Sequence, residues 1–374
     1  MLVSTNIKYS YNDVAVIPAH VSLIEHRSEC NPFITPNKLP IFTAPMSSVV
    51  GEGNFNLFEE NHINAILPRN VDIKKRIEYT QQGKWVAFSL NEFIDLFTNE
   101  NNVQQFINDN VKHVLIDVAN GHMKKIYDNT SKAKAIFGDM IEIMVGNIAN
   151  PSSYALAVEN GVSYVRVSIG SGLGCITSSN TAIHFPNASL IAETYSVKKF
   201  ISERDNIDMV KMPKIIADGG IRNYSDVIKA LALGADYVMI GGVFSSLVES
   251  CGLTFHKDNE GNQILINDWD ICNIVEIKGK FHDKQNNIIY DNLYKQFYGM
   301  ASDLGQKILN GEKTKTAEGV VKNINVTTNL SKWVDNMISY LKSAMSYTNT
   351  KEIKDLNKAS VILISNHTYN SVNK

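Results

Sequence analysis

The sequence predicts an α/β protein, a single (β/α)8 TIM barrel domain over residues 1–374, with a long flap and hairpin excursion at about 253–330. Three observations lead to this prediction. Eight short apolar runs recur along the chain, amphipathic stretches separate most of them, and glycine-rich or polar motifs follow the runs. A doubly wound open sheet is the alternative that the same alternation allows.

The apolar runs predict strands that are buried on both faces, which is typical of parallel sheets. They are LPIFTAPM (39–46), INAILPR (63–69), KWVAFSL (84–90), HVLIDVA (113–119), IEIMVGN (141–147), YVRVSIG (164–170), KIIADGG (214–220) and YVMIGG (237–242). Eight such runs in alternation with helices favour the closed barrel over the open sheet.

The amphipathic stretches predict helices. NPSSYALAVENG (150–161) and NYSDVIKALALGA (223–235) begin with Asn, Ser or Pro and end near Gly, which are helix start and stop signals. A later stretch, SKWVDNMISYLKSAMSYT (331–348), is expected to complete the barrel. The connection between the second and third strands, VDIKKRIEYTQQG (71–83), is too short to hold an extra domain.

The regular alternation stops after the eighth strand. Two turn signals, NEGN (259–262) and KQNN (284–287), lie between β-rich arms and predict hairpins. A long excursion within a compact domain is more often a functional lid than a linker. We therefore expect residues 253–330 to contribute to function.

Composition excludes several classes of protein. A formal net charge of −2 gives no reason to expect nucleic acid or a membrane surface as partner. The four cysteines, at 30, 175, 251 and 272, and the nine histidines show no metal-site spacing. Neither a signal peptide nor a run of about 18 apolar residues is present, so we expect a cytoplasmic protein.

Every candidate motif follows a predicted strand, and barrel active sites lie at the carboxyl ends of strands. The motifs are APMSS (44–48), DVANGH (117–122), VGNIANP (145–151), IGSGLGCITSSN (169–180), ADGGIRN (217–223) and IGGVFSS (240–246). The paired glycines in the last two lie where barrels commonly bind phosphate, although tight turns alone can also explain them. We favour a phosphorylated substrate.

Cys175 lies in a glycine-rich loop, two residues before Thr177. A lone cysteine is more often a buried packing residue. Its place at the catalytic end, near a hydroxyl, instead favours a nucleophile. The carbonyls of Gly170 and Gly172 can also line a site for a monovalent cation, and the spacing alone does not decide between these roles.

A resemblance to a known family covers nearly the whole chain, from about residue 8 to the C-terminus. The segments that carry it are YSYNDVAVIPA, APMSSV, DVANGH, GNIAN, GSGLGCIT, IADGGIRNYSDVIKALALGADYVMIGG and FYGMASD, in this order. Their combination resembles the IMP dehydrogenase/GMP reductase family. The family fold is a (β/α)8 barrel, in agreement with the strand count.

The resemblance implies roles for individual residues. Cys175 is similar to the nucleophile that attacks C2 of the purine, and Thr177 and Glu318 are similar to its proton-handling partners. The expected contacts to a purine mononucleotide are Asp218, Gly219, Gly220, Gly241, Gly242, Tyr298, Gly299, Met300, Ala301 and Gly319. The expected contacts to a nicotinamide cofactor are Asp117, Val118, Ala119, Gly146 and Asn147, with Arg27 and Arg69 as candidates for the extra phosphate of NADPH. Gly170, Gly172 and Cys175 correspond to potassium ligands, and the family is tetrameric.

Two reactions occur in the family. The dehydrogenase needs an Arg-Tyr pair in its flap to activate water, and residues 301–319 contain neither residue type. The missing CBS regulatory domain and the motifs DVANGH and FYGMASD also resemble the reductase, whereas CIT and Arg166 are closer to the dehydrogenase. We expect NADPH-dependent deamination of GMP to IMP through a Cys175 adduct. The alternatives are an NAD-dependent IMP dehydrogenase and a catalytically silent nucleotide-binding barrel.

Two positions and one segment depart from the family pattern. Leu173 stands where a phosphate-binding serine is usual, and Ser47 stands where an aspartate is usual. The segment IHFPN (183–187) is a loose version of a stretch that contains glycine and Pro-Gln.

Overall fold

The computed structural model describes residues 6–99, 103, 106, 110–258, 260–267, 270–277, 279–285, 288–290, 292–312 and 315–372. Eight parallel strands form one sheet in the order β2-β9-β8-β7-β6-β5-β4-β3. They are β2 (Ile41–Thr43), β3 (Ile66–Leu67), β4 (Trp85–Phe88), β5 (Lys112–Asp117), β6 (Ile141–Ile148), β7 (Tyr164–Val167), β8 (Lys214–Asp218) and β9 (Tyr237–Ile240). Each lies within or overlaps an apolar run that the sequence singled out, and only β5 and β6 extend one residue beyond their runs. The predicted strands are therefore confirmed.

The sheet closes on itself between its first and last strands. The backbone N–H of Asn64 donates to the carbonyl of Ile41 at 3.0 Å, and the N–H of Thr43 donates to the carbonyl of Asn64, also at 3.0 Å. Asn64 lies two residues before the start of β3. This parallel bridge completes the predicted (β/α)8 barrel.

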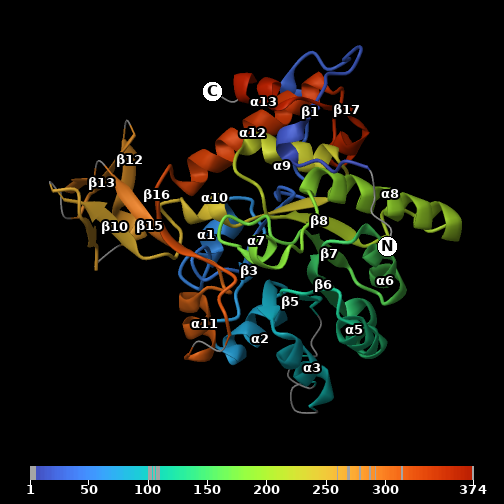
Figure 1. Cartoon of the computed structure of the whole chain (residues 1–374), viewed down its shortest axis with the longest axis horizontal. Helices are drawn as coiled ribbons and strands as arrows, with labels where there is room; N and C mark the ends of the chain where they lie inside the picture. The colour runs from blue at the N-terminus through green and yellow to red at the C-terminus, as the bar shows by residue number, and fades with distance from the viewer. Residues whose placement is uncertain are drawn as a thin grey trace.

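Helices surround the barrel (Figure 1). They are α1 (Phe55–Glu60), α2 (Ile73–Gln81), α3 (Leu90–Thr98), α5 (Lys124–Phe137), α6 (Tyr154–Glu159), α7 (Thr177–Thr181), α8 (Asn187–Asp205), α9 (Tyr224–Ala232), α10 (Gly242–Ser245) and α12 (Leu330–Tyr347). Helix α12 shows why these segments fold as they do. The side chain of Asn329 caps it by accepting from the N–H of Lys332, and its buried residues, among them Trp333, Met337 and Leu341, repeat at helical spacing.

The strand residues alternate between two apolar layers even though both faces are buried. On β5, Leu115 points to the barrel interior, where it joins Phe42 and Met144. Its neighbours Val114 and Ile116 belong to the outer layer between strands and helices. This two-residue alternation sets which end residues of each strand face the mouth of the barrel.

After β9 the chain leaves the barrel and forms antiparallel strands, which we call the extension (residues 253–325). In Figure 1 the strands of the extension project from the left of the barrel. One sheet has the order β11-β10-β15-β16, and the other has the order β12-β13-β14. The strands are β10 (Thr254–Lys257), β11 (Gln263–Leu265), β12 (Ile274–Ile277), β13 (Lys280–Asp283), β14 (Ile288–Tyr290), β15 (Leu293–Tyr298) and β16 (Val321–Asn325).

The extension also contains helix α11 (Asp303–Asn310), which the sequence analysis did not anticipate. The hydroxyl of Ser302 caps it by accepting from the N–H of Gly305, and Gly311 ends it in the left-handed region at φ 79°. The expected turn motifs NEGN and KQNN lie partly outside the described residues. The role of this region as a flap stays a prediction.

Short elements complete the chain. Strand β1 (Val14–Val16) pairs antiparallel with β17 (Val361–Leu363), close to the last helix, α13 (Asn366–Val372). The 3-10 helices are η1 (Tyr11–Asp13), η2 (Arg27–Glu29), η3 (Gly138–Met140), η4 (Pro151–Ser153), η5 (Ile271–Asn273) and η6 (Ile353–Lys358). In the described part of the chain, no helix has the length and apolar character needed to cross a membrane.

Candidate active site

One cavity of about 410 Å³ lies at the carboxyl ends of the barrel strands. Loops that follow β2, β5, β6, β7, β8 and β9 line it, together with two segments of the extension. The sequence-predicted residues in its wall are Asp117, Ala119, Asn147, Gly170, Gly172, Cys175, Thr177, Asp218, Gly219, Gly220, Gly241, Gly242, Gly299, Met300, Ala301, Glu318 and Gly319. The fold thus brings most of the predicted substrate and cofactor residues to a single cavity.

Cys175 lies in the loop between β7 and α7. Its backbone N–H donates to the carbonyl of Gly172 at 3.0 Å, which turns the loop towards the cavity. A Cβ on Gly174 would lie 2.5 Å from the ring of Phe297 on β15, so only glycine fits there. The loop that carries Cys175 is therefore packed directly against the extension.

A hydrogen-bond chain joins three side chains that the resemblance singles out. The thiol of Cys175 donates to Oγ1 of Thr177 at 3.3 Å, and the Thr177 hydroxyl donates to Oε2 of Glu318 at 2.7 Å. The backbone supports this approach, because the N–H of Ile176 donates to the carbonyl of Glu318 at 3.0 Å. The order thiol, hydroxyl, carboxylate provides a path along which a proton can move from sulfur to Glu318.

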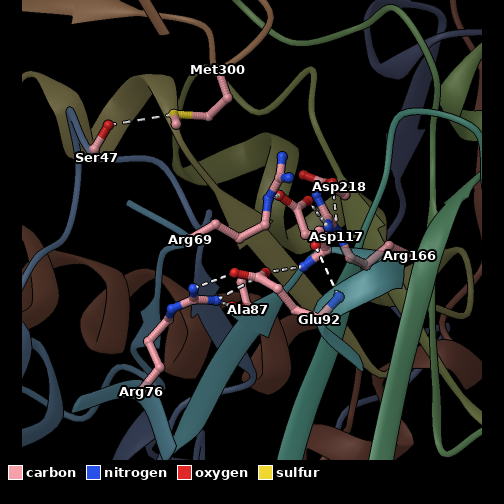
Figure 2. A network of polar contacts seen from close by, with 10 residues as sticks. Ser47, Arg69, Arg76, Ala87, Glu92, Asp117, Arg166, Asp218 and Met300 are labelled. Atoms are coloured by element: carbon pink, nitrogen blue, oxygen red, sulfur yellow. Dashed lines mark hydrogen bonds and ion pairs between the residues drawn. The ribbon is translucent and has the colours of Figure 1, made fainter. Parts of the chain in front are cut away.

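Arg166 on β7 bonds two carboxylates at the barrel mouth (Figure 2). Its guanidinium donates to Oδ1 of Asp117 and to Oδ2 of Asp218, both at 2.9 Å. Arg69 donates to the other oxygen of Asp117 at 3.0 Å. Two cations therefore balance the two carboxylates, Asp117 and Asp218, that line the cavity.

This arrangement shifts two pKa values. Burial disfavours the charged form of Asp117, but the positive charges of Arg69 and Arg166 outweigh that effect and lower its pKa. Burial also opposes the charge of Arg166, and the carboxylates of Asp218 and Asp117 reverse the effect and raise its pKa. Both groups are therefore held ionised inside the protein.

Asp218 keeps one oxygen available to a ligand. Its Oδ2 accepts from Arg166 and, at 2.7 Å, from the side-chain amide of Asn147. Among the described residues, no donor contacts its Oδ1. A carboxylate oxygen of this kind can accept from the hydroxyls of a sugar.

The loop after β8 needs its glycines. Gly219 and Gly220 have φ values of +88° and +73°, in the region that favours glycine. A Cβ on Gly220 would lie 2.6 Å from Nδ2 of Asn187. This buried asparagine donates to the carbonyl of Gly219 at 2.9 Å and so stabilises the loop after β8.

Asn187 is a functional candidate that sequence reasoning missed. Its Oδ1 accepts from the hydroxyls of Ser168 at 3.1 Å and Ser171 at 2.9 Å, which lie in the loop before Cys175. One amide therefore ties that loop to Gly219. The only signal in the sequence was its place in IHFPN, the loose version of the family's Pro-Gln stretch.

The structure shows what the side chains contact at the two positions that depart from the family pattern, Leu173 and Ser47. The side chain of Leu173 lies against Gly242, where an added Cβ would be 3.1 Å from the leucine. The hydroxyl of Ser47 lies 2.9 Å from the hydroxyl of Tyr298 and donates to the sulfur of Met300 at 3.5 Å, the second contact being drawn in Figure 2. Ser47 thus pairs with the extension.

Some predicted residues lie outside the described cavity wall. Tyr298 is buried with its hydroxyl turned to Ser47, and burial raises its pKa. Arg69 is paired with Asp117, and Arg27 is exposed in η2, next to α12. Val118 and Gly146 are also absent from the described lining, although the carbonyl of Val118 accepts from the N–H of Asn147 at 3.3 Å. Their contacts with a cofactor or substrate stay predictions.

Lys315 is a second missed residue. It lines the cavity from the segment that carries Glu318. A lysine in a polar stretch such as KTKTAEG gave no signal in the sequence, because most lysines of this kind are solvated.

The predicted potassium ligands form a compact turn. The carbonyl of Gly170 accepts from the Ser178 hydroxyl at 3.0 Å, and the carbonyl of Gly172 accepts from the N–H of Cys175 at 3.0 Å. Each carbonyl has a second lone pair, so these residues still fit a role as cation ligands. Potassium at this turn stays a prediction.

A barrel with a cavity at the carboxyl ends of its strands defines a broad class of proteins. A sequence model described as the IMP dehydrogenase / GMP reductase domain matches residues 8–264, more than half of the chain. The protein therefore belongs to the IMP dehydrogenase/GMP reductase family.

Curated relatives match along nearly the whole chain. A protein named GMP reductase from Staphylococcus aureus (strain MRSA252) is 27% identical over 376 residues, covering 97% of this chain and 98% of the relative. Proteins of the same name from Staphylococcus carnosus (strain TM300) and Bacillus cereus (strain ATCC 10987 / NRS 248) are each 26% identical. They too match 97% of this chain, and 98% and 97% of their own lengths.

Proposed function

We propose that this protein is a GMP reductase, an oxidoreductase that converts GMP to IMP and ammonia with NADPH. The observation that carries the proposal is the hydrogen-bond chain from Cys175 through Thr177 to Glu318 inside the cavity. The names of the relatives support the same activity. A cytoplasmic homotetramer, with potassium at the loop of Gly170 and Gly172, completes the proposal.

The first step is attack of the Cys175 sulfur on C2 of guanine, with the thiol proton passing to Thr177 and Glu318. The bond between C2 and the exocyclic nitrogen then breaks, and the electron pair leaves with the nitrogen. Glu318 returns a proton through Thr177, so that the nitrogen departs as ammonia. The purine remains joined to sulfur as a covalent thioimidate.

The second step replaces the sulfur at C2. A reduced nicotinamide, when bound, supplies a hydride to C2, and Cys175 leaves as a thiolate. The cavity fits such a group, because its wall joins Asp117, Ala119 and Asn147, on the expected cofactor side, to Cys175. These residues bind and orient the cofactor, while Asp218 Oδ1 accepts from the ribose of the nucleotide.

The absence of arginine and tyrosine from residues 301–319 favours the reductase over the dehydrogenase. A dehydrogenase must hydrolyse its adduct and therefore needs a base for water. The reductase needs an acid for the leaving nitrogen, a role that fits Glu318 because it accepts the Thr177 hydrogen bond.

Paired turnover assays test the proposal. The purified protein is mixed with GMP and NADPH in one assay and with IMP and NAD in the other, and the nicotinamide absorbance is followed. We expect NADPH oxidation with release of ammonia in the first assay. NAD reduction with IMP, and no reaction with GMP, would overturn the assignment in favour of the dehydrogenase.

A covalent probe tests the silent-barrel alternative. The protein is incubated with a 2-chloropurine nucleotide and digested, and Cys175 is examined by mass spectrometry. We expect a purine adduct on Cys175, because chloride leaves from C2 when the thiolate attacks. Bound nucleotide with unmodified Cys175 would favour a binding barrel without activity.

A further inference from the structure

Gln306 lies at the centre of α11 and is 2% exposed. Glutamine at such a position must place its polar amide among partners, because an unpaired buried amide costs about 1–3 kcal/mol. Its described partners, Ala301 and Lys315, belong to the two extension segments that line the cavity.

The amide of Gln306 forms a double hydrogen bond with the backbone of one residue. The N–H of Lys315 donates to Oε1 of Gln306 at 3.0 Å, and Nε2 of Gln306 donates to the carbonyl of Lys315 at 3.1 Å. The side chain thus takes the place of a neighbouring strand for this residue. Nε2 also donates to the carbonyl of Ala301 at 3.3 Å, so one side chain contacts both segments.

The helix that carries Gln306 has a fixed base. Gly305 packs its backbone onto the loop before the helix, where an added Cβ would lie 2.6 Å from the carbonyl oxygen of Gly299 and 2.7 Å from that of Met300. This contact leaves no freedom for a side chain at Gly305. Gln306 therefore extends from a helix that is seated on the cavity wall itself.

Lys315 is three residues from Glu318, and both line the cavity. The backbone of Glu318 has hydrogen bonds of its own: its N–H donates to the carbonyl of Ala301 at 3.0 Å, and its carbonyl accepts from the N–H of Ile176. The bonds of Gln306 fix the start of the segment, and those of Glu318 fix its end. The carboxylate then stays 2.7 Å from the Thr177 hydroxyl.

We propose that Gln306 is a positioning residue for Glu318: it holds the backbone of Lys315 to Ala301 and so keeps the carboxylate in reach of Thr177. The consequence for catalysis rests on the proposed function, whereas the hold on Lys315 does not. A misplacement of about 1 Å at a catalytic group can reduce the rate by about 10²-fold.

Limited proteolysis tests the hold on Lys315 independently of activity. The full-length Gln306→Met variant is digested with trypsin under native conditions, and the peptide that begins at Thr316 is quantified by mass spectrometry. We expect cleavage after Lys315 to be roughly tenfold faster than in the unsubstituted protein. The control is Gln263→Met, which makes the same replacement at an exposed site on β11. An unchanged cleavage rate would overturn the proposal.

Steady-state kinetics test the positioning role. For Gln306→Met we expect kcat with GMP and NADPH to fall about 10- to 100-fold, while KM for GMP stays within about threefold. Faster cleavage after Lys315 with an unchanged kcat would also overturn the role. If the unsubstituted protein does not turn over GMP, the proposed function fails, and the proteolysis result still decides whether Gln306 holds Lys315.

A second variant, Gln306→Glu, tests the proposal if the Gln306→Met protein folds poorly. Gln306→Glu keeps an acceptor for the N–H of Lys315 but replaces the donor by an oxygen that faces the carbonyls of Lys315 and Ala301. We expect faster cleavage and a lower kcat in this variant as well. Wild-type values of both in a folded Gln306→Glu protein would contradict the proposal.

Discussion

The nucleophile and its carboxylate partner come from two regions that are built in different ways. Cys175 belongs to a barrel loop, and its support comes from buried side chains, of which Asn187 bonds Ser168, Ser171 and Gly219. Glu318 belongs to the extension, and its support is mainly backbone pairing with Ala301 and Ile176. A site shared in this way needs both regions to be folded, and each can be disturbed separately.

The largest effect is expected at the nucleophile itself. Cys175→Ala removes the atom that bonds C2, so we expect no measurable GMP turnover and a largely retained nucleotide Kd. Turnover is followed by NADPH oxidation, and binding is measured by calorimetry. Retained activity would remove Cys175 from the mechanism. The control is Cys30→Ala, since Cys30 is a buried cysteine of the barrel region.

The next largest effect is expected on the extension side. Glu318→Gln keeps the shape of the side chain and removes its ability to accept and return a proton. We expect kcat for deamination to fall roughly 10²- to 10⁴-fold. The matched control, Glu312→Gln, changes an exposed glutamate of the same region. A loss below about threefold at Glu318 would exclude a role in proton transfer.

A smaller effect is expected at Asn187, whose amide joins the loop after β7 to the loop after β8. Asn187→Ala leaves the carbonyl of Gly219 and two serine hydroxyls without this partner, so the unfolding free energy should fall by about 1–3 kcal/mol. Because Gly219 is a predicted nucleotide contact, we expect KM for GMP to rise roughly tenfold, with a smaller change in kcat.

The control for Asn187 is Asn180→Ala, at an exposed position on α7. For Asn187→Ala we expect mainly KM to change, whereas for Gln306→Met we expect mainly kcat to change. A lower kcat with an unchanged KM in Asn187→Ala would contradict this difference. Urea unfolding and initial-rate kinetics measure both quantities.

The smallest effect concerns the stability of the extension. Burial lowers the pKa of Lys295 on β15 to about 8 from 10.5, against the opposing charges of Cys251 and Glu249. Above pH 8 the folded protein has released this proton while the unfolded chain still binds it, so the free energy of unfolding rises with pH. Between pH 7.5 and 9 we expect a rise of about 1 kcal/mol from this group.

Lys295→Met should abolish that rise, whereas Lys322→Met, at an exposed site on β16, should retain it. Urea unfolding at pH 7.5 and at pH 9 provides the measurement. Equal pH dependence in the Lys295→Met and unsubstituted proteins would show that Lys295 is not the group responsible.

The barrel could be predicted from the sequence because its signals are local. Buried strands such as β5 overlap apolar runs, and helices such as α9 begin at a capping side chain and end beside a glycine. Helix α11 was missed because residues 253–330 were interpreted as hairpins from the turn signals NEGN and KQNN. The Ser302 cap and Gly311 that bound α11 are nevertheless visible in the sequence.

The site could be predicted only in part. Cys175 stood out through its glycine-rich loop, whereas Glu318 was found through the resemblance alone, since 141 residues separate it from Thr177. Asn187 and Gln306 were not found at all. The described partners of Gln306 are backbone groups, and those of Asn187 are one backbone carbonyl and two serine hydroxyls. A single amide in a sequence does not indicate which distant groups the fold will bring to it.

Arg166 connects the two sides of the cavity energetically. Its guanidinium bonds Asp117, on the expected cofactor side, and Asp218, on the expected nucleotide side. A ligand that draws one carboxylate away changes how strongly the guanidinium holds the other. Binding free energies are linked reciprocally, so any change in cofactor affinity caused by the nucleotide equals the change in nucleotide affinity caused by the cofactor. If both expected ligands bind, a single coupling free energy describes both changes, and the buried guanidinium of Arg166 is the group in contact with both carboxylates.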